Sequence, residues 1–331
     1  GSSLVTKDFT GLIGGFVAQA IANHQATAPM NSRFIDATGD EPKLYTKDKV
    51  GSSDQYITVT SGTLQQDLND ARITQGGLVQ TTEGNCFVLA PLDAVSGTAP
   101  GLIDSNVTIG SNDTAIVRLF NVKGEEVTVA VSLARPLLGG FGGAANESPE
   151  AELSAYKAAL VQKAIVAAMP QLMQSDDAKS TSGYGSIVTG WPVNPLQFLT
   201  GNTPMEVPVA SLSPAGIFDL LQDRLGKNEA VVASSQYVAS GDNFSAQGVA
   251  ANHAYSVLDV SADESGQQWV TIRNPWGRGE LGTMPLNDTD FSQTKPADGA
   301  DDGVMRLKVE DFSKTFNIIN AVSTEERPRP N

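Results

Sequence analysis

The spacing of apolar residues along the chain predicts three helices. Residues 8–24 carry apolar side chains at helical spacing behind an Asp. A second helix runs from Ser148 to about Met169, because a cap hydroxyl, a Pro and a Glu precede a stretch rich in Ala, Leu and Val. Ser213-Pro214 opens a third, "AGIFDLLQDRLG". The part before the Pro204–Pro214 stretch is therefore expected to be helix-rich.

Strand patterns dominate the remainder of the chain. Two β-rich segments in 115–131 flank Lys123-Gly124, which indicates a hairpin. From Glu229 onward the chain reads mostly as strands, namely "AVVASS", "HAYSVLDV", "WVTIRNP" and "VMRLKV", before a last helix or strand ending near Val322. No internal repeat is visible, and the pattern is that of an α+β protein with a strand-rich last part.

Length and charge limit the kinds of molecule that the protein is expected to bind. The chain has 331 residues, 40% of them hydrophobic, and a formal net charge of -15. That length suits one large domain or two ordinary ones. The acidic balance disfavours nucleic acid and anionic membrane surfaces, and solubility explains it most simply, although cations such as calcium would be attracted. No apolar run reaches the length of a membrane span, and the start "GSS" without Met suggests an excised or mature form.

Cys86 is the only cysteine, so the fold is not held by internal disulfides or thiolate zinc clusters. Gly84 and Asn85 precede it and "FVLA" follows. A turn that leads into an apolar segment places the thiol at a helix N-terminus, where the dipole and free N–H groups favour thiolate and can hold an oxyanion. The simpler alternative is a buried small hydrophobe.

Histidine is nearly as scarce, with His24 and His253 alone. His253 heads one β-rich segment, and Asn274 ends another 21 residues later. Adjacent strands would place the two side chains together, so that the amide oxygen fixes the imidazole tautomer. A core histidine and a turn residue before Pro are the alternatives. Gln80, six residues before the cysteine, could direct its amide at a carbonyl oxygen under attack.

Three motifs together resemble the calpain family of papain-like cysteine proteases: "QTTEGNCFVLA", "NHAYSV" and "IRNPWGRGEL". Similar segments such as "LQFLTGN" and "DGVMRLKVEDF" extend the resemblance over about 75–322. It implies an α+β, papain-like two-lobe cysteine protease fold with a helical lobe and an antiparallel β lobe. The expected parts are an N-terminal extension packing on the core (1–70), a helical lobe with the nucleophile (71–207) and a β-rich lobe with His and Asn (208–331).

The resemblance also implies roles for individual residues. Cys86 would be the nucleophile, His253 the general base and acid, and Asn274 the group that orients the imidazole. Gln80 would complete an oxyanion hole with the backbone N–H of Cys86. Gly84 and Trp276 would line the substrate cleft, and Trp276 would shield the His–Asn contact from water.

Four positions depart from the family pattern: Phe87 in place of Trp, Asn252 in place of Gly, Leu281 in place of a second Trp, and Pro91 inside the expected cysteine helix. Because proline cannot donate, a kink that tilts the thiol is expected at Pro91. None of the departures removes a group needed for the chemistry.

No cofactor is expected for the chemistry, but calcium is a candidate ligand. The family's calcium ligands correspond to Glu280, Asp288 and Asp302, while Val304 stands where a last Glu would be. Oxygen ligands suit a hard cation, and solvated surface acids are an equal alternative.

The expected function is that of a calpain-like cysteine endopeptidase of bacterial type, which cuts a protein or peptide substrate by limited proteolysis through a thioester. Self-processing of a larger precursor fits this function, and a secreted or effector setting is favoured over a cytoplasmic one. The alternatives are a peptidoglycan amidase, a transglutaminase-type acyl transferase, and a protein-binding pseudoprotease.

Overall fold

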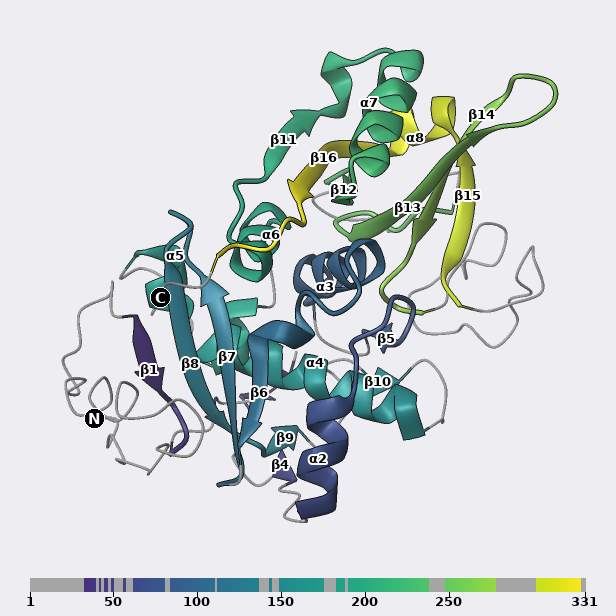
Figure 1. The fold of residues 1–331 in the computed structure, drawn as a ribbon. Helices are drawn as coiled ribbons and strands as arrows, with labels where there is room; N and C mark the ends of the chain where they lie inside the picture. The colour runs from purple at the N-terminus through teal and green to yellow at the C-terminus, as the bar shows by residue number, and fades with distance from the viewer. Residues whose placement is uncertain are drawn as a thin grey trace.

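The fold is seen in a computed structural model of the chain (Figure 1). The residues that it describes are 33–39, 42, 45–46, 49–50, 56–57, 62–80, 84–110, 112–136, 143–144, 149–175, 183–187, 190–237, 248–277 and 302–328. The helix predicted at 8–24 lies outside them.

The first lobe contains a four-stranded sheet with the order β1-β8-β7-β6. Its strands are β1 (Phe34–Asp36), β6 (Val107–Gly110), β7 (Thr114–Phe120) and β8 (Glu126–Ser132). β7 and β8 pair antiparallel, which confirms the hairpin. Gly124 takes φ +75° in the turn, a left-handed conformation that glycine adopts without strain. The expected helical lobe therefore has a sheet of its own, to which β1 adds a parallel edge strand.

The helices of the first lobe are α2 (Gly62–Asp70), α3 (Cys86–Thr98), α4 (Pro149–Ala167), α5 (Met169–Met173) and α6 (Val193–Thr200). Of these, α2, α4 and α6 contact strands of the four-stranded sheet. α4 confirms the second predicted helix. Short strand pairs complete this part: β2 (Tyr45–Thr46) with β3 (Lys49–Val50), β4 (Tyr56–Ile57) with β9 (Arg135–Pro136), and β5 (Leu78–Val79) with β10 (Gly143–Ala144).

The second lobe is a six-stranded antiparallel sheet with the order β11-β16-β12-β13-β14-β15. Its strands are β11 (Met205–Pro208), β12 (Glu229–Ser235), β13 (Ala254–Ala262), β14 (Gln268–Arg273), β15 (Val304–Lys308) and β16 (Phe316–Ser323). The four segments read as strands in the sequence are thus confirmed. Helices α7 (Pro214–Gly226) and α8 (Val309–Thr315) pack against the sheet. Ser213 caps α7, as predicted, by accepting a 3.1 Å hydrogen bond from Gly216 N.

The two faces of β12 belong to different hydrophobic cores. Ala230 and Val232 join the core that contains α3, whereas Val231 and Ala233 join the core formed with α7. This division follows from the alternation of side chains along a strand. Figure 1 shows the result, with α3 lying between the two sheets and α7 on the far side of the second.

α3 is buried on every side from Cys86 to Ser96. α3 contacts β12 and β13 of the second sheet as well as α6 and β5 of the first lobe, so it has no solvent face, which explains its nearly continuous apolar sequence. Pro91 lies inside α3, and the helix continues through it to Thr98. The carbonyl of Phe87 lacks its usual helical donor there, yet the proline does not break the helix.

Candidate active site

Cys86 is the first residue of α3, so the structure places the thiol at a helix N-terminus. The helix starts there because the carbonyl oxygen of Asn85 accepts from Val88 N at 2.9 Å and from Leu89 N at 3.1 Å. The side chain of Asn85 does not cap the helix. Its Nδ2 instead donates to Oε1 of Gln162 on α4, at 2.9 Å, which fixes the start of α3 against α4.

The thiol of Cys86 lies against the β lobe. Burial raises its pKa to about 11, while backbone hydrogen bonds from Ala254, Phe87 and Cys86 itself oppose the rise. Ala254 is the first residue of β13 and follows His253 directly. The thiol of Cys86 and the start of β13, directly after His253, therefore meet where the two lobes pack together.

His253 and Asn274 form a buried pair at the same place. Nε2 of His253 is 2.8 Å from Oδ1 of Asn274. The two residues are 7% and 0% exposed. Burial lowers the pKa of His253 to about 4, and the hydrogen bond with Asn274 acts in the opposite direction. The environment thus favours a neutral imidazole.

The orientation of the Asn274 amide is fixed by a second donor. Trp276 N donates to Oδ1 of Asn274 at 3.0 Å, so the atom that faces His253 is an oxygen. Nε2 of the neutral imidazole must then carry the proton, and Nδ1 keeps its lone pair. The indole of Trp276 lies with its ring centroid 4.6 Å from that of His253, at the place where the resemblance predicts a shield.

Gln80 is buried at 6% exposure, immediately after β5. Its backbone N donates to the carbonyl oxygen of Pro275 at 2.6 Å. This bond ties the segment before the cysteine to the Asn-Pro-Trp turn of the other lobe. Gly84 is exposed beside the start of α3.

Asn252 explains one of the departures from the family pattern. Its φ is +53°, in the left-handed region that favours glycine. Asparagine tolerates this conformation better than other non-glycine residues. The backbone shape before His253 is therefore kept without the glycine, and Asn252 N donates to Gln236 O at 3.0 Å.

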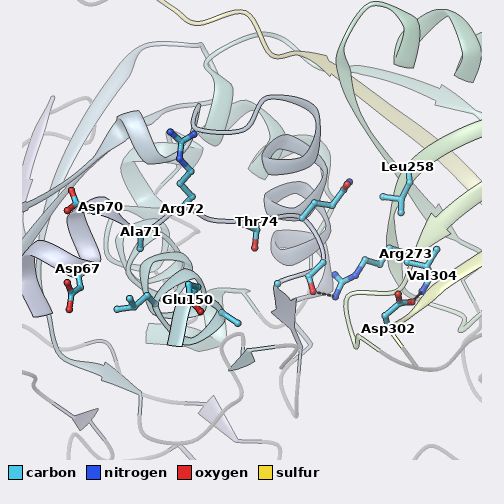
Figure 2. A pocket seen from close by; sticks show the side chains of 15 residues that line it. Asp67, Asp70, Ala71, Arg72, Thr74, Glu150, Leu258, Arg273, Asp302 and Val304 are labelled. Carbon is cyan, nitrogen blue, oxygen red and sulfur yellow. Dashed lines mark hydrogen bonds between the residues drawn. The ribbon is translucent and has the colours of Figure 1, made fainter. Parts of the chain in front are cut away.

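The candidate calcium ligands are only partly within the described residues. Glu280 and Asp288 lie outside them. Asp302 accepts from Val304 N at 2.9 Å through Oδ1, and it lines a cavity of about 790 Å³ together with Arg273 (Figure 2). Among the described residues, no three His, Cys, Asp or Glu side chains gather as a metal cluster. Because two of the three candidate ligands lie outside the described residues, calcium binding at Glu280, Asp288 and Asp302 stays a prediction.

A polar cluster that was not predicted from the sequence lies between the lobes. Asp93 on α3 pairs with Arg273 at the end of β14, and Ser256 on β13 joins them. The available signal was an aspartate inside an otherwise apolar helix, because a buried charge requires a partner.

The fold and the site define a class of protein. A two-lobed α+β chain has the architecture of a papain-like cysteine peptidase when a buried cysteine at a helix N-terminus lies against the strand that follows a histidine, and that histidine is hydrogen-bonded to an asparagine. The family model described as "Calpain family cysteine protease" matches residues 60–323. The chain therefore belongs to the calpain family of cysteine proteases, which confirms the resemblance and indicates cysteine-type peptidase activity.

A search of curated proteins finds no match to the chain. Within the described ranges, every helix is too short or too polar to traverse a lipid bilayer.

Proposed function

We propose that the protein is a cysteine endopeptidase that cleaves peptide bonds within protein substrates, using Cys86, His253 and Asn274 as its triad. One observation carries the proposal: the Cys86 thiol lies against the backbone of Ala254, and the preceding residue, His253, has its imidazole held to Asn274 by a buried 2.8 Å hydrogen bond. A merely structural cysteine would not need an oriented base beside it.

The first chemical step is attack by sulfur. Cys86 Sγ bonds to the carbonyl carbon of the scissile peptide, and its proton passes to Nδ1 of His253. The carbonyl becomes a tetrahedral oxyanion, which the backbone N–H of Cys86 and the side-chain amide of Gln80 would stabilise. Asn274 holds the ring so that Nδ1, the nitrogen without a proton, is the one available to the thiol.

The second half of the cycle returns the enzyme to its starting state. The imidazolium of His253 gives its proton to the leaving amine, the C–N bond breaks and a thioester forms on Cys86. His253 then takes a proton from water, which attacks the thioester and releases the acid product. The sulfur recovers its proton in this step.

Burial sets the resting state of the pair. It raises the pKa of Cys86 and lowers that of His253, so the environment favours the neutral thiol and imidazole. Transfer of one proton within the pair forms a thiolate–imidazolium pair without changing its net charge. The N–H groups around the sulfur favour that transfer.

We further propose limited proteolysis of folded proteins, with self-processing of a larger bacterial secreted or effector chain as one case. The chemistry itself uses only protein groups, and calcium would act on the arrangement of the lobes. These proposals rest on the family resemblance and on the acidic character of the chain.

The test is turnover of casein by wild type and by Cys86→Ala, each with and without a calcium chelator. We expect the wild type to cleave casein and to be labelled by an epoxide inhibitor of papain-like enzymes. Cys86→Ala should fold, take no label and lose nearly all turnover, because the pair acts as a unit. Cleavage of muropeptides instead of casein would indicate an amidase, and a folded wild type with neither turnover nor label would contradict the proposal.

A further inference from the structure

Asp93 and Arg273 form a buried ion pair that joins the two lobes. Nη1 of Arg273 lies 3.2 Å from Oδ1 of Asp93, and the side chains of Arg273 and Asp93 are 2% and 1% exposed. Asp93 belongs to α3 and Arg273 ends β14. Figure 2 shows Arg273 extending from the β lobe toward the segment that precedes α3.

Both charges have further hydrogen-bond partners. Asp93 accepts from Gly76 N at 2.7 Å and from Ser256 Oγ at 2.6 Å. Nη2 of Arg273 donates to the carbonyl oxygens of Gly76, at 3.1 Å, and Leu78, at 2.9 Å. A buried pair is costly to desolvate unless such bonds satisfy its remaining donors and acceptors. This network therefore tolerates little displacement of the four segments that contribute to it, namely α3, residues 76–78, β13 and β14.

Asp93 is placed to control the position of the nucleophile helix. It lies seven residues after Cys86, which is close to two helical turns, so both residues lie on the same side of α3. That side packs against β13. A shift or rotation of α3 at Asp93 would also move the thiol.

The other members of the network lie next to the remaining site residues. Arg273 directly precedes Asn274, and Ser256 is paired with Arg273 across β13 and β14. Leu78, which Arg273 holds, lies two residues before Gln80. The same guanidinium thus contacts the helix of the nucleophile and the segment that leads to the oxyanion candidate.

We propose that Asp93 and Arg273 are positioning residues for the peptidase reaction. Their ion pair holds α3 in register with β13 and β14, so that the Cys86 thiol and the His253 imidazole are aligned in the resting protein. The inference rests on the proposed function, because alignment has a consequence only if these groups react.

The experiment compares Asp93→Asn with wild type in kcat, KM, the rate of Cys86 alkylation by iodoacetamide, and hydrogen exchange of the Gly76 amide. We expect kcat and the alkylation rate to fall together by about 10²-fold in the folded variant, with KM changed less than threefold. Exchange at Gly76 should accelerate, because its acceptor loses charge. Adding Arg273→Gln to Asp93→Asn should cost little more, because the two residues act as one unit.

Two further variants separate positioning from general stability. Glu126→Gln breaks the 2.8 Å Arg118–Glu126 pair, which lies within the first lobe, and should leave kcat unchanged. Arg273→Lys retains a positive charge but not the planar guanidinium, so its kcat should lie between those of wild type and Asp93→Asn. If Asp93→Asn does not fold, Arg273→Lys tests the positioning role by itself.

The outcomes are distinguishable. A folded Asp93→Asn or Arg273→Lys with wild-type kcat and alkylation rate would overturn the positioning role. An equal loss of kcat in Glu126→Gln would overturn the positioning role as well, since breaking any ion pair would then be enough to lower kcat. A wild type without turnover would instead refute the proposed function, and the Gly76 exchange would still report whether the network links the lobes.

Discussion

Replacing Asn274 by Ala should show how much of the activity depends on the orientation of the His253 imidazole, because the variant keeps the imidazole but removes its hydrogen-bond partner. The Asn274 oxygen accepts from His253 Nε2 at 2.8 Å and from Trp276 N at 3.0 Å. Alanine leaves both donors without this acceptor in a site where Asn274 is 0% exposed. A buried donor left unsatisfied costs about 1–3 kcal/mol. With Trp276 only half-buried, the free energy of unfolding should fall by about 2–4 kcal/mol.

The loss of rate follows from the same contact. Without the oxygen, neither the ring orientation nor the tautomer with Nδ1 unprotonated is favoured. If about 1.5–3 kcal/mol of that preference is lost, kcat should fall by about 10–10², at one tenfold step per 1.4 kcal/mol. KM should change little, because Asn274 is buried and does not reach the substrate.

The assay is steady-state cleavage of a fluorogenic peptide, below the unfolding temperature of each variant, with thiol alkylation as a second measure. Asn274→Asp is the matched control, since it keeps both acceptor contacts. Its added negative charge should raise the pKa of His253 and move the acidic limb of the kcat/KM profile to higher pH. A folded Asn274→Ala with wild-type kcat and alkylation rate would refute the orienting role.

Three other predictions concern the same site. Gln80→Ala should lower kcat by ~10²–10³ with little change in KM if its amide stabilises the oxyanion; an unchanged kcat would remove Gln80 from the mechanism. Gly190→Ala should slow alkylation of the Cys86 thiol, because its Cβ would lie 2.4 Å from Cε2 of Phe87, the residue that follows Cys86. Gly226→Ala meets no atom within 4 Å and should leave the alkylation rate unchanged. Because burial holds the His253 pKa at about 4, below its ordinary 6.5, the unfolded chain binds a proton more readily, and the stability that this residue contributes above pH 6.5 is lost as pH falls toward 4. The loss should approach ~3 kcal/mol in chemical unfolding curves, and a His253→Gln variant with the same pH slope as wild type would contradict it.

Much of the fold could be predicted from local patterns. The capped start of α7, the α4 segment and the β7–β8 hairpin each carry a signal within a few residues, so propensity and turn chemistry suffice. Their arrangement in space has no such local signal. The pairing of β1 with β8 joins residues far apart in the sequence, and nothing in three residues specifies that partner.

Some residues of the candidate site could likewise be predicted from the sequence, and others could not. Cys86 and His253 were found because they are rare, and Asn274 because its motif is distinctive. Asp93 and Arg273 were not predicted, because charged residues are common in the sequence and most are exposed. Only the structure shows that these two are buried against each other. Pro91 was predicted to kink α3, and the helix continues through it to Thr98 because tertiary packing outweighs one lost hydrogen bond. The tilt of the thiol that a kink would cause stays a prediction.

The parallel pairing of β1 bears on how this enzyme can be prepared for study. The family match begins at residue 60, whereas Phe34 on β1 is 4% exposed and pairs with Thr128 of β8. A fragment trimmed to the matched boundaries would lose this strand and uncover the hydrogen-bonding edge of β8, which invites intermolecular association. Material intended for kinetics should therefore retain the chain from before Arg33, whose carbonyl accepts from Thr128 N at 2.7 Å.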